Sequence, residues 1–118
     1  MKQNGLSLYT SPLEQRIAKH LVDEILKRGY MVRVWDGEGW AHKEYTSERR
    51  VILDAMASTG IDSLRLSQTD PVWGKRRIGG ITLIYGNDRD LISDWTDRPE
   101  IDEIANAVND WIDRTVRA

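Results

Sequence analysis

Aromatic and basic side chains recur at alternating positions of segments that the residue pattern predicts to be strands. The run YMVRVW over residues 30–35 alternates as a half-buried strand does, and WAHKEY over 40–45 predicts its antiparallel partner. Together with a third predicted strand at 62–68, these segments place one group of side chains on the face away from the apolar positions. That group consists of Arg33, Trp35, Trp40, His42 and Arg65.

Side chains of these types could bind two classes of macromolecule. Trp and Arg are enriched at the energetic centres of protein interfaces, so the face could bind another protein or a second copy of the chain. Aromatic rings also stack on bases while guanidinium groups attract phosphates, so nucleic acid is the alternative ligand. A third interpretation is structural, since the rings could simply cover the edge of the sheet. As a function we predict non-enzymatic protein binding or self-association, with nucleic-acid binding as the alternative.

A short basic run, in which Gly74 is followed by Lys75, Arg76 and Arg77, is the second candidate anion site. Three adjacent cations could hold a phosphate or a nucleic-acid backbone, but cations beside a strand also prevent pairing with another chain. The net charge of −2 argues against a general nucleic-acid binder. Binding of nucleic acid would use this run together with the two arginines of the sheet face.

No pattern in the sequence predicts catalysis or a cofactor. His42 and Glu44 would share a strand face, where the carboxylate could orient the imidazole, but no recognisable nucleophile accompanies them. The chain has no cysteine, no phosphate-binding loop and no dinucleotide-binding glycine motif. We therefore expect no enzyme activity.

Four aspartates after the longest predicted strand have a spacing similar to that of a calcium loop. They are Asp88, Asp90, Asp94 and Asp97. A calcium loop needs a glycine at its sharp turn and an oxygen at each ligand position. Because that glycine is missing and Ile92 occupies a ligand position, we expect no metal site.

Three helices are predicted to position the strands. Residues 11–14 (SPLE) form a capping box with a proline in the first turn, and Gly29 ends this helix after two cations. A second helix is expected to begin at Thr46 or Ser47. Residues 97–100 (DRPE) repeat the start signal for a final helix, which carries an apolar stripe.

The longest run of strand-type residues covers 77–95, and we interpret it as the central hairpin of the sheet. A strand over 76–85 leads through a GNDR turn into a returning strand at 90–95. The preceding segment 69–75 contains Pro71, which cannot donate to a strand ladder, so a connecting loop is predicted there.

The predicted element order is α-β-β-α-β-β-β-α, which indicates an α+β domain. Short turns require antiparallel neighbours, so we expect an antiparallel or mixed sheet of about five strands with three helices on one face. Residues 1–10 lack periodicity and are expected to be a flexible lead-in to a single domain over 11–118. The side chains predicted to face the helices are Val32, Val34, Leu64, Leu66, Ile81, Leu83 and Tyr85. Glu44, Thr82 and Ile84 are predicted to face away with the candidate binding group.

The composition is typical of a soluble globular domain, with 40% hydrophobic and 31% charged residues. No apolar run approaches the length of a membrane span, and the first ten residues lack the apolar segment of a secretory signal. The absence of cysteine fits a reducing compartment. We therefore expect a cytoplasmic protein without a membrane partner.

Three blocks of sequence resemble small proteins encoded by bacteriophages and prophages. The blocks are VWDGE at 34–38, ILDAMAST at 52–59, and IYGND at 84–88 continuing to ISDW at 92–95. The similarity covers roughly residues 13–97 and excludes most of the final helix. That group has no assigned activity, so the resemblance implies a genomic setting, with the host cytoplasm as the location, and carries over no functional residue.

Overall fold

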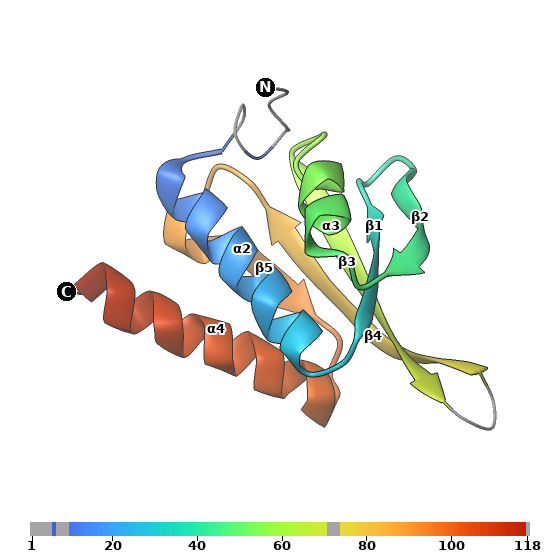
Figure 1. The fold of residues 1–118 in the computed structure, drawn as a ribbon. Helices are drawn as coiled ribbons and strands as arrows, with labels where there is room; N and C mark the ends of the chain where they lie inside the picture. Colours follow the sequence, from blue (N-terminus) through green and yellow to red (C-terminus); the bar gives the residue numbers. More distant parts are fainter. Residues whose placement is uncertain (1–5, 7–9, 71–73, 118) are drawn as a thin grey trace.

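The computed structural model, which describes residues 6, 10–70 and 74–117, is an α+β domain with a five-stranded antiparallel sheet (Figure 1). The strands are β1 (Met31–Trp35), β2 (Trp40–Thr46), β3 (Ile61–Asp70), β4 (Gly74–Ile84) and β5 (Ile92–Trp95). The helices are α2 (Pro12–Lys27), α3 (Arg49–Ala55) and α4 (Pro99–Arg117), with a short 3₁₀ turn η1 (Asp88–Asp90). The predicted fold class and element order are confirmed.

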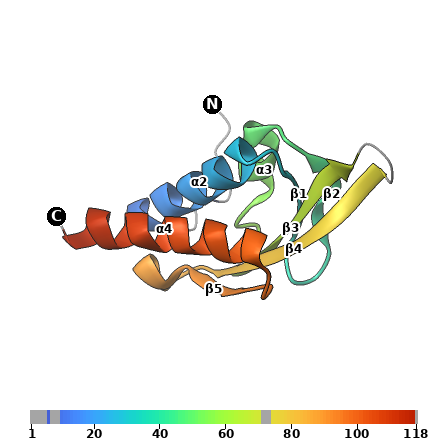
Figure 2. The same cartoon turned by 90° about the horizontal axis from the view of Figure 1, so that it is seen from below.

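The helices α2, α3 and α4 cover the same face of the sheet, and none of the described helices covers the opposite face, which we call the bare face (Figure 2). Alternation along the strands explains this arrangement, because the side chains predicted to face the helices are buried from Val32 to Leu83. The apolar stripes of α2 and α4 complete the core. Leu6 is also buried in that core, so this position of the predicted flexible lead-in packs against the domain.

The predicted capping box starts α2. The Ser11 hydroxyl accepts from the backbone N–H of Glu14, and the Glu14 carboxylate accepts from the backbone N–H of Ser11 at 3.2 Å. The same buried carboxylate also accepts from the backbone N–H groups of Gly86 (2.7 Å) and Asn87 (3.2 Å). One side chain therefore caps a helix and fixes it to the turn that follows β4.

The prediction that residues 77–95 form the central hairpin is wrong. The strand order is β2-β1-β3-β4-β5, so β3 lies at the centre and β5 at one edge. After α3 the chain returns as β3 and pairs with β1 on one side and β4 on the other. The edges of the sheet are therefore β2 and β5, and the predicted central hairpin supplies one inner strand and one edge strand.

Two predicted boundaries differ from the structure. The predicted loop at 69–75 is mostly paired, because β3 continues to Asp70 and β4 begins at Gly74, opposite it. Pro71, on which that prediction rested, lies outside the described residues. Helix α3 begins at Arg49, later than predicted, because β2 extends to Thr46 and takes the expected cap residue into the sheet. Among the described residues, no helix combines the length and apolar character needed to cross a membrane.

Candidate functional site

A hollow of about 290 Å³ lies on the bare face of the sheet, and it receives side chains from all five strands and the residue after β5. We call it the arginine hollow because Arg33 of β1, Arg65 of β3 and Arg77 of β4 line it. Tyr45 of β2 and Asp94 of β5 also contribute to its wall. The structure thus brings together three of the predicted binding residues that lie far apart in the sequence.

The register of the sheet explains how the arginines meet. Arg33 pairs directly with Arg65 across the β1–β3 ladder, and Arg65 pairs with Gly80 across the β3–β4 ladder. A register shift between Leu66 and Ser67 then sets Arg77 opposite Ser67. Because partners across a ladder project on the same face, the three cationic side chains lie on one face and line the same hollow.

Gly80 leaves space for the side chain of Arg65. A Cβ atom at Gly80 would lie 3.2 Å from Cδ of Arg65 and 3.3 Å from the backbone oxygen of Leu64. Both separations are tighter than ordinary van der Waals contact, so a larger residue would push Arg65 out of its present position. Gly80 therefore shapes the floor of the hollow.

Arg33 is held by aromatic rings. Its guanidinium carbon lies 4.1 Å from the ring centroid of Trp40 and 4.8 Å from that of Tyr45. Trp40 in turn packs edge-on against Trp35, with 5.0 Å between the ring centroids. These distances are within the range of cation–π attraction, so the rings restrict where the charged group of Arg33 can go.

The three arginines of the hollow have no ion pair with any described carboxylate, whereas most other described arginines do. Arg65 donates from Nε to the Ser63 hydroxyl at 2.9 Å, and Nε of Arg33 is buried with no hydrogen-bond partner among the described atoms. Asp94 lines the hollow, but its carboxylate accepts from the backbone N–H of Trp95 at 2.9 Å. Cations gathered in this way, next to one carboxylate, form a site for an anion.

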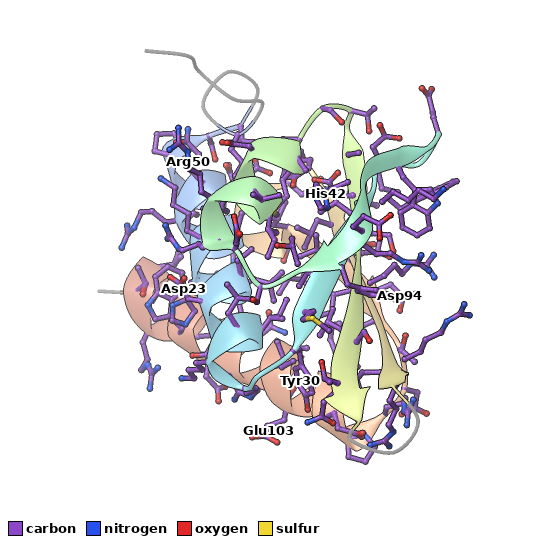
Figure 3. The ribbon with its side chains drawn as sticks, turned by 45° about the vertical axis from the view of Figure 1, so that its right-hand side comes forward. Asp23, Tyr30, His42, Arg50, Asp94 and Glu103 are labelled. Carbon is purple, nitrogen blue, oxygen red and sulfur yellow. The ribbon has the colours of Figure 1, made fainter. Side chains whose placement is uncertain are left out.

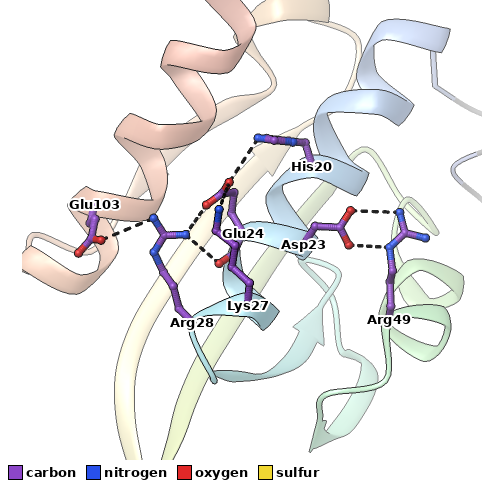
Figure 4. Close-up of polar contacts among 7 residues, drawn as sticks. All are labelled: His20, Asp23, Glu24, Lys27, Arg28, Arg49 and Glu103. Atoms are coloured by element: carbon purple, nitrogen blue, oxygen red, sulfur yellow. Dashed lines mark hydrogen bonds and ion pairs between the residues drawn. The ribbon is translucent and has the colours of Figure 1, made fainter.

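The helical side of the molecule shows the opposite pattern (Figure 4). Arg49 donates to Asp23 of α2 at 2.7 Å. Arg28 donates to Glu24 and lies 3.6 Å from Glu103. The hydrogen bonds from Arg28 and Lys27 keep the pKa of Glu24 below its ordinary value, although burial opposes them as the largest single influence. Carboxylates thus neutralise arginines on this side, whereas the arginines of the hollow pair with no carboxylate among the described residues.

The predicted basic run does not act as a unit. Arg77 enters the hollow, whereas Nη2 of Arg76 lies 3.6 Å from the Glu100 carboxylate at the start of α4. The side chain of Lys75 lies outside the described residues. Alternation along β4 separates the two arginines onto different sides.

The register contradicts the prediction that His42 shares the bare face with Trp40. Trp40 pairs with Trp35, but His42 pairs with Val34, whose side chain faces the core. An extra residue in β2 between these two pairs reverses the alternation. Figure 3 accordingly shows His42 on the side of β2 toward α3 and Asp94 on the other side of the sheet.

His42 contacts the backbone and not a carboxylate. Its Nδ1 atom lies 2.7 Å from the backbone oxygen of Glu44. Neither residue lines the arginine hollow or the second hollow described below. The structure therefore places this pair beside neither of these two hollows.

A second hollow, of about 370 Å³, lies between residues 57–60 and the end of β4. Beneath it the buried Asp62 accepts from the backbone N–H of Ala57 at 2.7 Å and from the Tyr85 hydroxyl at 2.5 Å. Burial is the main reason that the pKa of Asp62 rises to about 6 and that the pKa of Tyr85 lies above its ordinary value. Sequence analysis missed Asp62, although its alternation with Leu64 and Leu66 placed it on the core face.

Two of the four aspartates considered for calcium, Asp88 and Asp94, accept hydrogen bonds. Asp88 accepts from the Ser11 hydroxyl at 2.8 Å, which adds a second link between the start of α2 and η1. Asp94 accepts from its neighbouring backbone, as described above. Within the part of the chain that the structure describes, no group of three or more metal-binding side chains occurs.

Comparisons of the chain with protein-family models, with curated proteins and with solved structures find no match. The arginine hollow is the concave site that carries the largest group of predicted binding residues. Its geometry is therefore the basis on which a function is assigned.

Proposed function

We propose that this chain is a non-catalytic binding protein that docks a partner protein on the bare face of its sheet, with the arginine hollow at the centre of the contact. The observation that carries the proposal is the convergence of three arginines without carboxylate partners among the described residues in one hollow. Folding alone gains little from gathering like charges, and directly opposed like charges weaken a strand pair. A partner that supplies the missing negative charge accounts for the arrangement.

Aromatic side chains beside the hollow support a protein partner. Trp40 is exposed at 36% and Trp35 packs against it, so the contact would include an aromatic anchor next to arginine. Trp and Arg are the residue types that contribute most at protein interfaces. Trp40 and Tyr45 already restrict the side chain of Arg33 in the free protein. Less conformational entropy is therefore lost when a partner binds.

A partner other than a second copy fits this site best. In a symmetric dimer the same patch of each subunit meets its counterpart. Such a dimer would set the three unpaired arginines of one copy against those of the other. The resemblance of three sequence blocks to phage and prophage proteins supports an accessory role in a host cytoplasm as part of the same proposal.

The proposal is tested by affinity capture from a bacterial lysate with charge-reversed variants. Arg65→Glu with Arg77→Glu reverses the charge of the bare face, and Lys19→Glu with Arg114→Glu makes the same charge change on the helices. We expect at least one captured protein that binds to wild type and to the helical variant but not to the bare-face variant. The same protein, once purified, should bind with the same preference. If every captured protein is retained equally by both variants, the bare face is not the docking surface.

Single-stranded nucleic acid is the second candidate, because the rings of Trp40 and Tyr45 lie on the same face as the unpaired arginines. Bases could stack on the rings while phosphates meet the guanidinium groups. This function predicts oligonucleotide binding at about 50 mM salt that weakens steeply by about 200 mM. Fluorescence anisotropy with a labelled oligothymidylate measures it, and no binding at the lower salt concentration rules it out.

A further inference from the structure

We infer that the arginine hollow recognises an extended acidic peptide segment whose carboxylates occupy alternate positions. The inference rests on the proposed function and names the chemistry of the partner. It follows from the relative placement of Arg33, Arg65 and Arg77 on the sheet.

The first two arginines form a pair. Arg33 and Arg65 are direct partners on neighbouring strands, so their backbones lie about 5 Å apart and their side chains project on the same face. Two arginine side chains that start from paired backbone positions are long enough to reach one carboxylate between them, and each offers N–H donors in a plane that matches its two oxygens. The pair therefore defines one anion position.

The third arginine defines a second position. Arg77 lies on β4 opposite Ser67, two residues further along β3 than Arg65. One strand spacing combined with a rise of two residues separates the Cα atoms of Arg65 and Arg77 by about 8 Å. Two separate anionic groups, and not one small anion, are needed to reach both positions.

An extended peptide presents side chains at such a spacing. Residues i and i+2 of a strand lie on one face and are about 7 Å apart, whereas residues i and i+1 point to opposite faces. Acidic residues at alternate positions would therefore place one carboxylate on the Arg33–Arg65 pair and the next on Arg77. A contiguous acidic block would turn part of its charge away from the sheet.

The charge around the hollow favours a short acidic peptide over a polynucleotide. Asp94 lines the wall, and it would repel a continuous row of phosphates. The chain as a whole has a net charge of −2, which argues against general binding of nucleic acid. Two or three carboxylates are enough to neutralise the three arginines of the hollow.

The test uses labelled synthetic peptides of fixed composition on the intact chain. One peptide alternates Glu with Ser, a second carries the same residues as a Glu block followed by a Ser block, and a third alternates Gln with Ser. We expect the alternating Glu peptide to bind about tenfold more tightly than the block peptide, and the Gln peptide to show no binding. Arg77→Gln should weaken binding of the alternating peptide, because Arg77 lines the hollow without an ion pair to any described carboxylate.

Matched controls separate a lost site from a lost fold. Arg114→Gln removes one exposed arginine from α4 and should leave binding unchanged. The melting temperature of Arg77→Gln should match that of wild type. Weaker peptide binding by this variant would then result from the altered site and not from unfolding. Arg65→Gln gives an independent second variant.

Other outcomes overturn the inference. Equal affinity for the alternating and block peptides would show that spacing is not read, and tighter binding of oligothymidylate at the same salt concentration would assign the hollow to nucleic acid. Absence of peptide binding by wild type would reject an acidic ligand. If capture of a protein from the lysate still depends on Arg65 and Arg77, the proposed function stands without the acidic peptide. If capture is independent of these arginines, the proposed function is rejected as well.

Discussion

Asp62 shows how a single residue can make stability depend on pH. Its carboxylate is fully buried and one of its oxygens, Oδ1, has no partner among the described atoms. Burial raises its pKa from 3.8 to about 6, and the nearby Asp36 adds to the rise. The folded state therefore holds this proton more tightly than the unfolded state does. Its contribution to stability is complete below pH 3.8 and is lost as the pH rises through 6.

We predict that the free energy of unfolding increases by roughly 1 kcal/mol between pH 7.5 and pH 5 because Asp62 becomes protonated. Denaturant unfolding of wild type and of Asp62→Asn at each pH measures the effect. The neutral Asn removes the titration, so the free energy of unfolding of wild type should rise relative to that of Asp62→Asn as the pH falls. Lowered pKa values at Glu24 and Asp36 act in the opposite direction and are common to both proteins. Parallel pH profiles would assign the rise to another group.

The direct pairing of Arg33 with Arg65 has a cost in the free protein. Like charges directly opposite each other weaken a strand pair by about 0.5 kcal/mol, and salt screens the repulsion. We predict that Arg65→Thr stabilises the free chain at low salt and that the gain shrinks as salt is added. Thermal unfolding across a salt series tests this, with Arg114→Thr on the helical side as the comparison. A loss of stability at every salt concentration would mean that Arg65 serves the fold.

At the level of elements, Glu14 links two parts of the chain that are far apart in the sequence, the start of α2 and the turn after β4. The carboxylate caps α2 and accepts backbone N–H groups from the turn between β4 and η1. We predict that Glu14→Ala lowers the free energy of unfolding by about 3 kcal/mol, because buried donors lose their partner. Glu14→Gln keeps an acceptor oxygen and should cost less. Chemical denaturation of both variants provides the measurement, and equal costs would show that the charge, not the hydrogen bonds, stabilises the turn.

Elements determined by local sequence were the predictable part of this fold. The capping box of α2 and the strand alternation that buries Val32 and Leu64 follow from neighbouring residues, so the order and class of elements could be predicted. The central place of β3 depends on pairing between distant segments, which no local pattern encodes. The extra residue in β2, which places His42 on the opposite side from the one expected, likewise depends on the pairing of β2 with β1.

The candidate site was predictable to a similar extent. Alternation placed Arg33 and Arg65 on the bare face, because that pattern is local. That Arg77 lines the hollow and Arg76 does not could not be predicted. This difference depends on the register of β4 and on the position of Glu100, which neighbouring residues do not determine. The absence of carboxylate partners around the hollow depends on which acids the helices hold on their own side, a property of the assembled domain (Figure 4).

At the scale of the whole molecule, the sheet separates two surfaces of different charge. Ion-paired side chains lie on the helices, and arginines without a carboxylate partner among the described residues gather on the bare face. A symmetric dimer through that face would bring like charges together at short range, where salt near 0.15 M screens only beyond about 8 Å. We therefore predict that the chain alone remains a monomer at this ionic strength.

Size-exclusion chromatography with light scattering measures that prediction over a wide range of protein concentrations. The mass should stay at that of a single chain, and Trp40→Ala should not change it. Adding the alternating acidic peptide should keep the protein monomeric while raising its melting temperature, because a ligand that binds only the folded state stabilises it. A dimer that Trp40→Ala dissociates would instead show that the exposed ring outweighs the repulsion between arginines, and that a second copy of the chain is the partner of this face.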